Sequence, residues 1–144
     1  MKQIVINRCY GGWGLSDQAV RRYLELAGLS VYPEIEGDNT MLTTYWLVPT
    51  GPSRYDYKIA STLSSTWSEE EHQAASILWD EQVFDPRAIA RDDPLLVQLV
   101  LELGDQAANW ACVLGIVEIP DDVEWIIEEC DGAEWIAEKH RTWN

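Results

Sequence analysis

The chain has few cysteines and histidines, and this shortage excludes several kinds of site. Its three cysteines, Cys9, Cys112 and Cys130, are an odd number without C-x-x-C spacing, which argues against a disulfide framework and a zinc site. The two histidines, His72 and His140, lie far apart in the sequence and form no H-E-x-x-H motif. We therefore expect no metal ion and no other cofactor.

Positive charge is scarce as well. Ten lysines and arginines stand against 25 aspartates and glutamates, which gives a formal net charge of −15. A protein that binds nucleic-acid backbone in general needs the opposite sign, because phosphate contacts supply most of its affinity. Two interpretations remain: a protein with a local positive pocket, or an acidic protein that inhibits a basic nucleic-acid-binding partner by mimicry. Part of the charge also serves solubility alone.

Long apolar runs are missing too. No run approaches the roughly 20 residues that span a bilayer, and residues 1–3 lead into an expected strand without a signal-type apolar region. Together with the cysteine usage, this pattern predicts a cytoplasmic protein that contacts no membrane.

Phenylalanine occurs once, whereas tryptophan occurs eight times. The tryptophans are scattered along the chain, so no single stripe holds them all. Indole rings serve in cores, at subunit interfaces or as stacking partners of bases, and these uses stay open for each one. A chain of 144 residues does not bury eight indoles easily, so we expect a homo-oligomer.

Hydrophobic periodicity predicts a mixture of hairpins and helices. The second and third strands should form one antiparallel pair, and the last two strands another. We therefore predict an α+β fold in which a mostly antiparallel sheet packs with a few helices, in a single ligand-binding domain of residues 1–144. Strands are expected at residues 4–6, 29–36, 41–48, 55–59, 112–119 and 123–129, helices at 17–27, 69–78, 94–103 and 133–140, and an irregular segment or single strand at 84–91.

Three of the expected helices begin with capping signals. Ser16 precedes the first helix, and Ser68 with Glu71 forms a capping box before the second. Asp93 precedes the third helix and is followed by proline at the first helical position. This third helix is apolar nearly all round, so we expect it to be the buried centre of the fold.

A glycine-rich loop lies between the first strand and the first helix. Gly11, Gly12 and Gly14 let backbone N–H groups approach an anion closely, and Arg8 and Arg21 lie near them in the sequence. The pattern is neither G-x-G-x-x-G nor a Walker loop. A tight turn and a phosphate-binding loop therefore both remain open.

The sequence contains no convincing catalytic set. Ser16 follows glycines but does not match the G-x-S-x-G elbow, and a Cys9–His140 pair would depend on the fold. The adjacent Asp92 and Asp93 are explained by a helix cap. We expect a protein that is not an enzyme, and a nucleotide-processing enzyme ranks third behind the binding interpretations.

Several stretches together resemble a family of small phage proteins, the Thoeris anti-defence sponges. The resemblance leaves out residues 49–83, and Cys130 stands where the family pattern has tyrosine. It rests on IVINRCYGG (4–12), RDDP (91–94), VEIPDDVEW (117–125), DGAEW (131–135) and HRTW (140–143).

The resemblance implies a non-enzymatic homo-oligomer that sequesters a cyclic nucleotide signal, either a cyclic ADP-ribose isomer or a cyclic oligonucleotide. Such a sponge needs aromatic faces for the base, a few arginines for the phosphates and no catalytic machinery. Arg91 either binds the ligand or pairs with a nearby acid, and His140 either binds it or interacts with a helix dipole. The residues expected to face the ligand are Arg8, Tyr10, Gly11, Gly12, Trp13, Ser16, Arg21, Phe84, Arg91, Asp92, His140 and Arg141.

Overall fold

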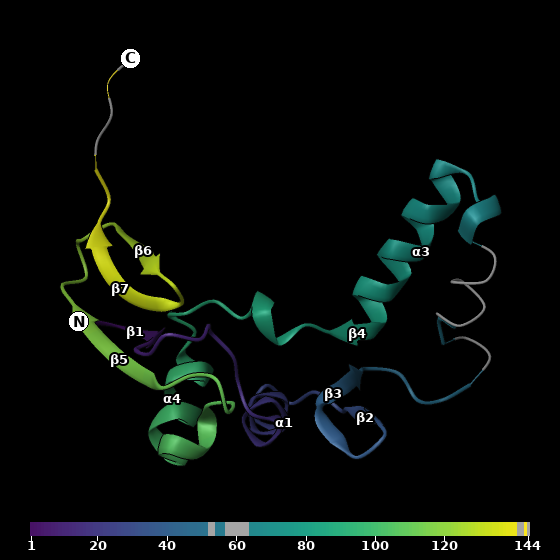
Figure 1. Cartoon of the computed structure of the whole chain (residues 1–144), viewed down its shortest axis with the longest axis horizontal. Helices are drawn as coiled ribbons and strands as arrows, with labels where there is room; N and C mark the ends of the chain where they lie inside the picture. Colours follow the sequence, from purple (N-terminus) through teal and green to yellow (C-terminus); the bar gives the residue numbers. More distant parts are fainter. Residues whose placement is uncertain (52–53, 57–63, 141–142, 144) are drawn as a thin grey trace. The chain divides into compact units, whose positions relative to one another are not determined.

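The computed structural model describes residues 1–51, 54–56, 64–140 and 143. These residues form three α-helices and seven strands, and every strand pair is antiparallel, which confirms the α+β prediction. The chain divides into two compact units, one of Met1–Gly28 with Pro86–Asn144 and one of Leu29–Asp85 (Figure 1). That residues 1–144 act as a single ligand-binding domain stays a prediction.

A two-stranded sheet forms the centre of the first unit. Strand β1 (Lys2–Asn7) pairs with β5 (Leu114–Ile119) from Lys2 opposite Ile119 to Asn7 opposite Leu114. Ile4 and Val5 are fully buried because α4 (Pro94–Leu103) and the last hairpin both contact β1. Figure 1 shows this arrangement, with the hairpin β6–β7 and α4 on opposite sides of the sheet.

Helices α1 (Asp17–Leu26) and α4 begin at the caps that the sequence predicts. The Ser16 side chain accepts from the Ala19 N–H, and Asp93 accepts from the Leu95 N–H. Burial of α4 all round was wrong, because Leu101 is 67% exposed. The helix packs against α1 and the sheet with one side only, and its opposite side faces solvent.

Polar contacts tie α1 to α4 and its cap. Arg22 binds both carboxylate oxygens of Glu102 at 2.8 Å, a two-bond geometry that fixes orientation. The Tyr23 hydroxyl donates to Asp93 at 2.7 Å. Burial, followed by this hydrogen bond, raises the pKa of Tyr23 to about 12. The short 3-10 helix η3 (Gly104–Ala107) follows α4.

The C-terminal hairpin corrects two predictions. Strand β6 (Trp125–Cys130) pairs with β7 (Ala133–Glu138) and not with β5, and the predicted helix at 133–140 is therefore a strand over most of its length. Asp131 and Gly132 explain this, because both have positive φ, 50° and 90°. An Asp-Gly turn of this kind returns the chain directly into an antiparallel partner.

The second unit contains a three-stranded sheet and one helix. The predicted hairpin is present as β2 (Tyr32–Glu36) with β3 (Asn39–Trp46), and β4 (Val83–Phe84) pairs with β3. Helix α3 (Glu69–Gln82) begins after the Ser68 cap, as predicted, and ends four residues later than expected. A short 3-10 helix, η1 (Ser64–Thr66), precedes α3. Another, η2 (Pro86–Ala88), follows β4 in the chain and belongs to the first unit.

Aromatic rings fill the interior of the second unit. Trp79 of α3 contacts Trp46 and Tyr55 edge-on, with centroids 5.4 and 5.8 Å apart, and the Arg54 guanidinium lies 4.2 Å from the Trp46 ring centroid. Trp46 is buried and thus serves as a core residue, whereas Trp79 is half-buried and packs against it. Residues 57–59 of the strand predicted at 55–59 lie outside the described residues.

The described helices give no candidate membrane span. The longest, α3, has 14 residues, and none combines the length and apolar character needed to cross a bilayer.

The turn at Gly132 should be intolerant of any side chain. A Cβ atom there would lie 2.5 Å from the Gly12 nitrogen, and φ is +90°. Gly104 offers a matched control, because its φ is also positive but no atom lies within 4 Å of its Cβ position. Strain alone should make Gly104→Ala cost about 1 kcal/mol of unfolding free energy. Gly132→Ala should cost clearly more in urea unfolding, and equal losses would contradict the close packing of the two turns.

Candidate functional site

The glycine-rich loop is held between two other segments of the first unit. The Gly11 N–H donates to the Asp131 carbonyl in the β6–β7 turn at 3.2 Å. The Gly14 carbonyl accepts from the Asn109 N–H at 3.3 Å and from the Cys112 thiol at 2.8 Å. The backbone groups of Gly11 and Gly14 therefore bind protein, and this geometry favours the tight-turn interpretation of the loop.

The same glycines are required by close approach. A Cβ atom on Gly11 would collide with the Ala111 carbonyl oxygen, and one on Gly14 would collide with the Asn109 side chain. A valine at Gly11 should therefore disturb folding before it affects any ligand.

Arg91 is at the centre of a buried cluster. Its guanidinium forms two bonds with the Glu134 carboxylate, at 2.7 and 3.0 Å, and a third with the Val5 carbonyl at 3.2 Å. The Trp13 ring covers it, with 3.5 Å between the guanidinium carbon and the ring centroid. The side chains of Arg91 and Glu134 are only 18% and 7% exposed. Arg91 thus has the nearby acid that the sequence left open, and a ligand role for it stays a prediction.

Asn7 completes this cluster and was missed by the sequence analysis. It is fully buried at the end of β1, and its amide nitrogen donates to the carbonyls of Cys9 and Gly132 at 3.0 and 2.8 Å. Its side-chain oxygen accepts from the Val113 N–H at 3.1 Å, and its own N–H donates to Glu134 at 2.7 Å. One polar residue at the end of an apolar strand was the available signal.

The cluster shifts the pKa of Glu134. Burial alone would raise it, but the hydrogen bonds from Arg91 and the Asn7 N–H, together with the Arg91 charge, outweigh burial and lower the pKa of this carboxyl below its usual 4.5. The carboxylate is therefore ionised at neutral pH and locks Arg91 in place.

Three other predicted site residues have helix-related positions. Ser16 caps α1 and donates its hydroxyl to the Gln106 carbonyl at 2.6 Å. Arg21 binds Asp17 on the exposed side of α1 at 3.0 Å. Asp92 is exposed and directly precedes the α4 cap. Binding roles for these residues remain predictions.

The last three predicted residues are Phe84, His140 and Arg141. Phe84 belongs to β4 of the second unit, where it pairs with Tyr45. His140 is exposed just beyond β7. Arg141 lies outside the described residues.

A second group of side chains in the first unit faces solvent. Tyr10 and Trp110 are 77% and 78% exposed, and Val113 is 52% exposed. Their segments adjoin, because the Arg8 N–H donates to the Val113 carbonyl at 2.7 Å and the Cys9 thiol donates to the Ala111 carbonyl at 3.3 Å. We call these four exposed residues on adjoining segments, Arg8, Tyr10, Trp110 and Val113, the aromatic rim.

Arg8 forms no ion pair with a described residue, unlike Arg21, Arg22 and Arg91 of the same unit. Its side chain lies flat on Gly115, where a Cβ atom would collide with it, and it donates to the Ile116 carbonyl at 3.3 Å. Among the described residues no carboxylate lies within 4.0 Å of its guanidinium, whereas Arg21, Arg22 and Arg91 each have one. Arg8 therefore has no carboxylate partner among the described residues, and it lies two residues before the exposed Tyr10 in the sequence.

Trp110 was not among the predicted site residues. Eight scattered tryptophans carried no pattern that separates the exposed ones from the core ones. The segment of Trp110 adjoins the glycine-rich loop through the contact between Cys9 and Ala111, which the sequence does not reveal.

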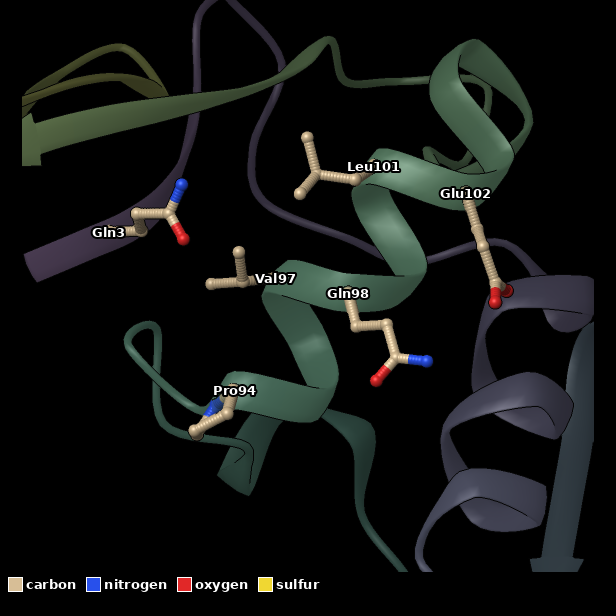
Figure 2. Close-up of a pocket in the computed structure, with 6 residues that line it drawn as sticks. All are labelled: Gln3, Pro94, Val97, Gln98, Leu101 and Glu102. Carbon is tan, nitrogen blue, oxygen red and sulfur yellow. The ribbon is translucent and has the colours of Figure 1, made fainter.

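A groove on the first unit lies away from the aromatic rim residues, none of which lines it. Figure 2 shows it between α4 and β1, where it is open and has a volume of about 460 Å³. None of the predicted ligand-facing residues lines it; the lining residues are Gln3, Pro94, Val97, Gln98, Leu101 and Glu102. In the described part of the chain, no three His, Cys, Asp or Glu side chains are placed to hold a metal ion.

The Arg91–Glu134 pair should make stability depend on pH. Because the folded pKa of Glu134 is lowered, its stabilising effect is present above about pH 4.5 and is lost as the pH falls through the folded pKa. At pH 7, Glu134→Gln leaves Arg91 buried without its counter-ion and should cost about 3 kcal/mol. Urea unfolding of both proteins between pH 7 and pH 3 measures the difference, which should shrink at acid pH. A difference that stays constant would contradict this pairing.

The comparisons with known proteins identify no family. No family model matches the chain, and neither curated proteins nor solved structures gave a match.

Proposed function

We propose that this protein is a phage anti-defence protein that sequesters a cyclic nucleotide immune signal without cleaving it, in the cytoplasm of the infected host cell. The ligand is a cyclic ADP-ribose isomer or a cyclic oligonucleotide, and the protein acts as a homo-oligomer. The resemblance to the Thoeris anti-defence sponges names this ligand class, and the aromatic rim supports it.

One observation carries the proposal. Two aromatic side chains that are more than three-quarters exposed, Tyr10 and Trp110, lie on adjoining segments with Arg8, which has no carboxylate partner among the described residues. Exposed rings stack on bases of any sequence, and such stacking contributes about 1–3 kcal/mol per base. A guanidinium supplies paired donors for phosphate oxygens.

The proposed site also reconciles anion binding with a strongly acidic chain. The net charge of −15 would repel a phosphate at long range, but the rim has the positive charge of Arg8, which has no carboxylate partner among the described residues. At physiological salt, repulsion from charges more than about 8–10 Å away is largely screened, whereas a direct contact is weakened much less. A discrete site of this kind differs from the extended basic surface of a nucleic-acid-binding protein.

The buried cluster behind the rim supports rigid binding. Asn7 bonds to the backbone on both sides of the glycine-rich loop, and Gly11 is pressed against Ala111. A surface that is already fixed before binding loses little conformational freedom when the ligand arrives. On this proposal, Arg91, Trp13 and the glycines hold the rim in shape.

Substitutions in the rim should weaken ligand binding while the fold stays intact. Tyr10→Ala and Trp110→Ala should each raise the Kd for cyclic ADP-ribose isomers or cyclic oligonucleotides about tenfold, because each removes one stacking face. Arg8→Ala should act similarly, and Arg8→Lys should recover part of the affinity. Isothermal titration calorimetry measures these changes. Trp135→Ala is the control, because Trp135 is an exposed tryptophan on β7 outside the rim.

The same titrations distinguish the alternatives. Unchanged affinity in the three rim variants would overturn the proposed site. Failure of the wild-type protein to bind any of these nucleotides would favour the acidic mimic, which binds a basic partner instead. A bound ligand that is recovered altered after heating the complex would indicate an enzyme.

A further inference from the structure

The two edges of the β1–β5 sheet differ in how many of their outward backbone groups have hydrogen-bond partners. At the outer edge of β1, both the N–H and the carbonyl of Val5 bond to Arg91, at 2.9 and 3.2 Å. The Asn7 N–H donates to the Glu134 carboxylate at the same edge. The Arg91–Glu134 pair therefore occupies the positions that another strand would take.

The outer edge of β5 has no such cover. The N–H and carbonyl groups of Val5 and Asn7 point away from β5, so Val5–Ile116 and Asn7–Leu114 are non-hydrogen-bonded pairs. The N–H and carbonyl groups of Ile116 and Leu114 therefore point away from β1, toward the outer edge of β5. Glu118 follows the same alternation. Within the described residues β5 pairs with β1 alone, and the Arg8 side chain on the Ile116 carbonyl is the one contact found on these outward groups.

The residues of β5 do little to protect this edge. The strand reads Leu-Gly-Ile-Val-Glu-Ile and contains no lysine or proline, the residues with which proteins usually block an edge. Glu118 is its one charged residue. Five uncharged residues in an unpaired edge strand form a template for another extended chain.

We propose that this edge binds β5 of a second copy of the chain, in an antiparallel pair with its two-fold axis at Ile116. In this register Ile116 lies opposite Ile116 of the other copy, and Leu114 lies opposite Glu118. The outward groups of the three residues then make about six backbone hydrogen bonds, two at each facing pair. The arrangement closes on itself, as a two-fold interface requires.

The charges along the seam fit a second copy in this register. The two Glu118 carboxylates stay at opposite ends of the seam and do not face each other. Arg8 crosses β5 at Gly115 and Ile116, next to Leu114, which Glu118 of the second copy faces. The two Arg8 side chains, which bond the Ile116 carbonyls, therefore lie near the middle of the seam, between the two Glu118 carboxylates at its ends.

This inference does not depend on the proposed function, because it rests on backbone geometry. Two copies that each carry −15 repel one another, so added salt should strengthen the pairing. A dimer held mainly by ion pairs would weaken instead.

The test replaces the outward N–H of Ile116. Ile116→Pro removes this donor, which makes no bond to β1, so the variant should stay folded while the pairing is lost. Ile116→Val keeps the donor and is the matched control. Light scattering at micromolar concentration should give a mass of about 33 kDa for the wild-type protein and the control, twice the 16.4 kDa of one chain, and about 16 kDa for Ile116→Pro.

Two results would overturn the proposal. One is a wild-type protein that remains at 16.4 kDa at every salt concentration up to about 0.5 M, where the Debye length is short and the repulsion between the copies is screened. The other is an Ile116→Pro variant that keeps the mass of the wild-type assembly. Should this variant unfold, amide hydrogen exchange of the wild-type protein decides, because dimerisation should protect the N–H groups of Leu114, Ile116 and Glu118 in a concentration-dependent way, and fast exchange would refute it.

Discussion

The ion pair between Arg91 and Glu134 joins three segments that lie far apart in the sequence. Arg91 precedes α4, Glu134 lies on β7, and both bond to the outer edge of β1. The pair is almost entirely buried, so both charges depend on each other and on the backbone groups that complete their hydrogen bonds. Its bonds hold the hairpin β6–β7 over the sheet, and they thereby bring the Asp131–Gly132 turn against the glycine-rich loop. The contact between this turn and the loop, the Gly11–Asp131 hydrogen bond, therefore depends on the position of the hairpin.

In the first unit, the residues that support the aromatic rim are packed against protein, whereas the residues of the rim itself are exposed. Gly11 and Gly14 lie against protein atoms, and Trp13 and Arg91 lie against each other. Tyr10 and Trp110, carried by the same packed segments, face solvent. A fixed framework with a few exposed rings, and with one arginine that has no carboxylate partner among the described residues, agrees with the binding function proposed above. In the β1–β5 sheet of the same unit, Arg91 and Glu134 occupy the outer edge of β1, and among the described residues no strand pairs with the outer edge of β5.

The sequence predicted those elements whose signals are local. The caps at Ser16, Ser68 and Asp93 placed three helix starts, and alternation around the turn at residues 37–39 placed the β2–β3 hairpin. Long-range pairing was not predictable in this way. Residues 123–129 were assigned to the nearer strand β5, although β5 pairs with β1 and the Asp-Gly turn directs β6 to β7. The site shows the same limit: Trp110 looks like any other tryptophan in the sequence, and the acid that binds Arg91 lies 43 residues away from it.

The most direct test of the proposed function follows the indole N–H signals of ¹⁵N-labelled protein during titration with a cyclic ADP-ribose isomer or a cyclic oligonucleotide. Each of the eight tryptophans gives one such signal, assigned by substitution. The account predicts that the Trp110 signal and the backbone signals of Arg8 and Tyr10 shift in a saturable manner, while the signal of Trp135 stays in place. Saturable binding that shifts only tryptophans of the second unit, such as Trp46 and Trp79, or no shift of any signal, would contradict it.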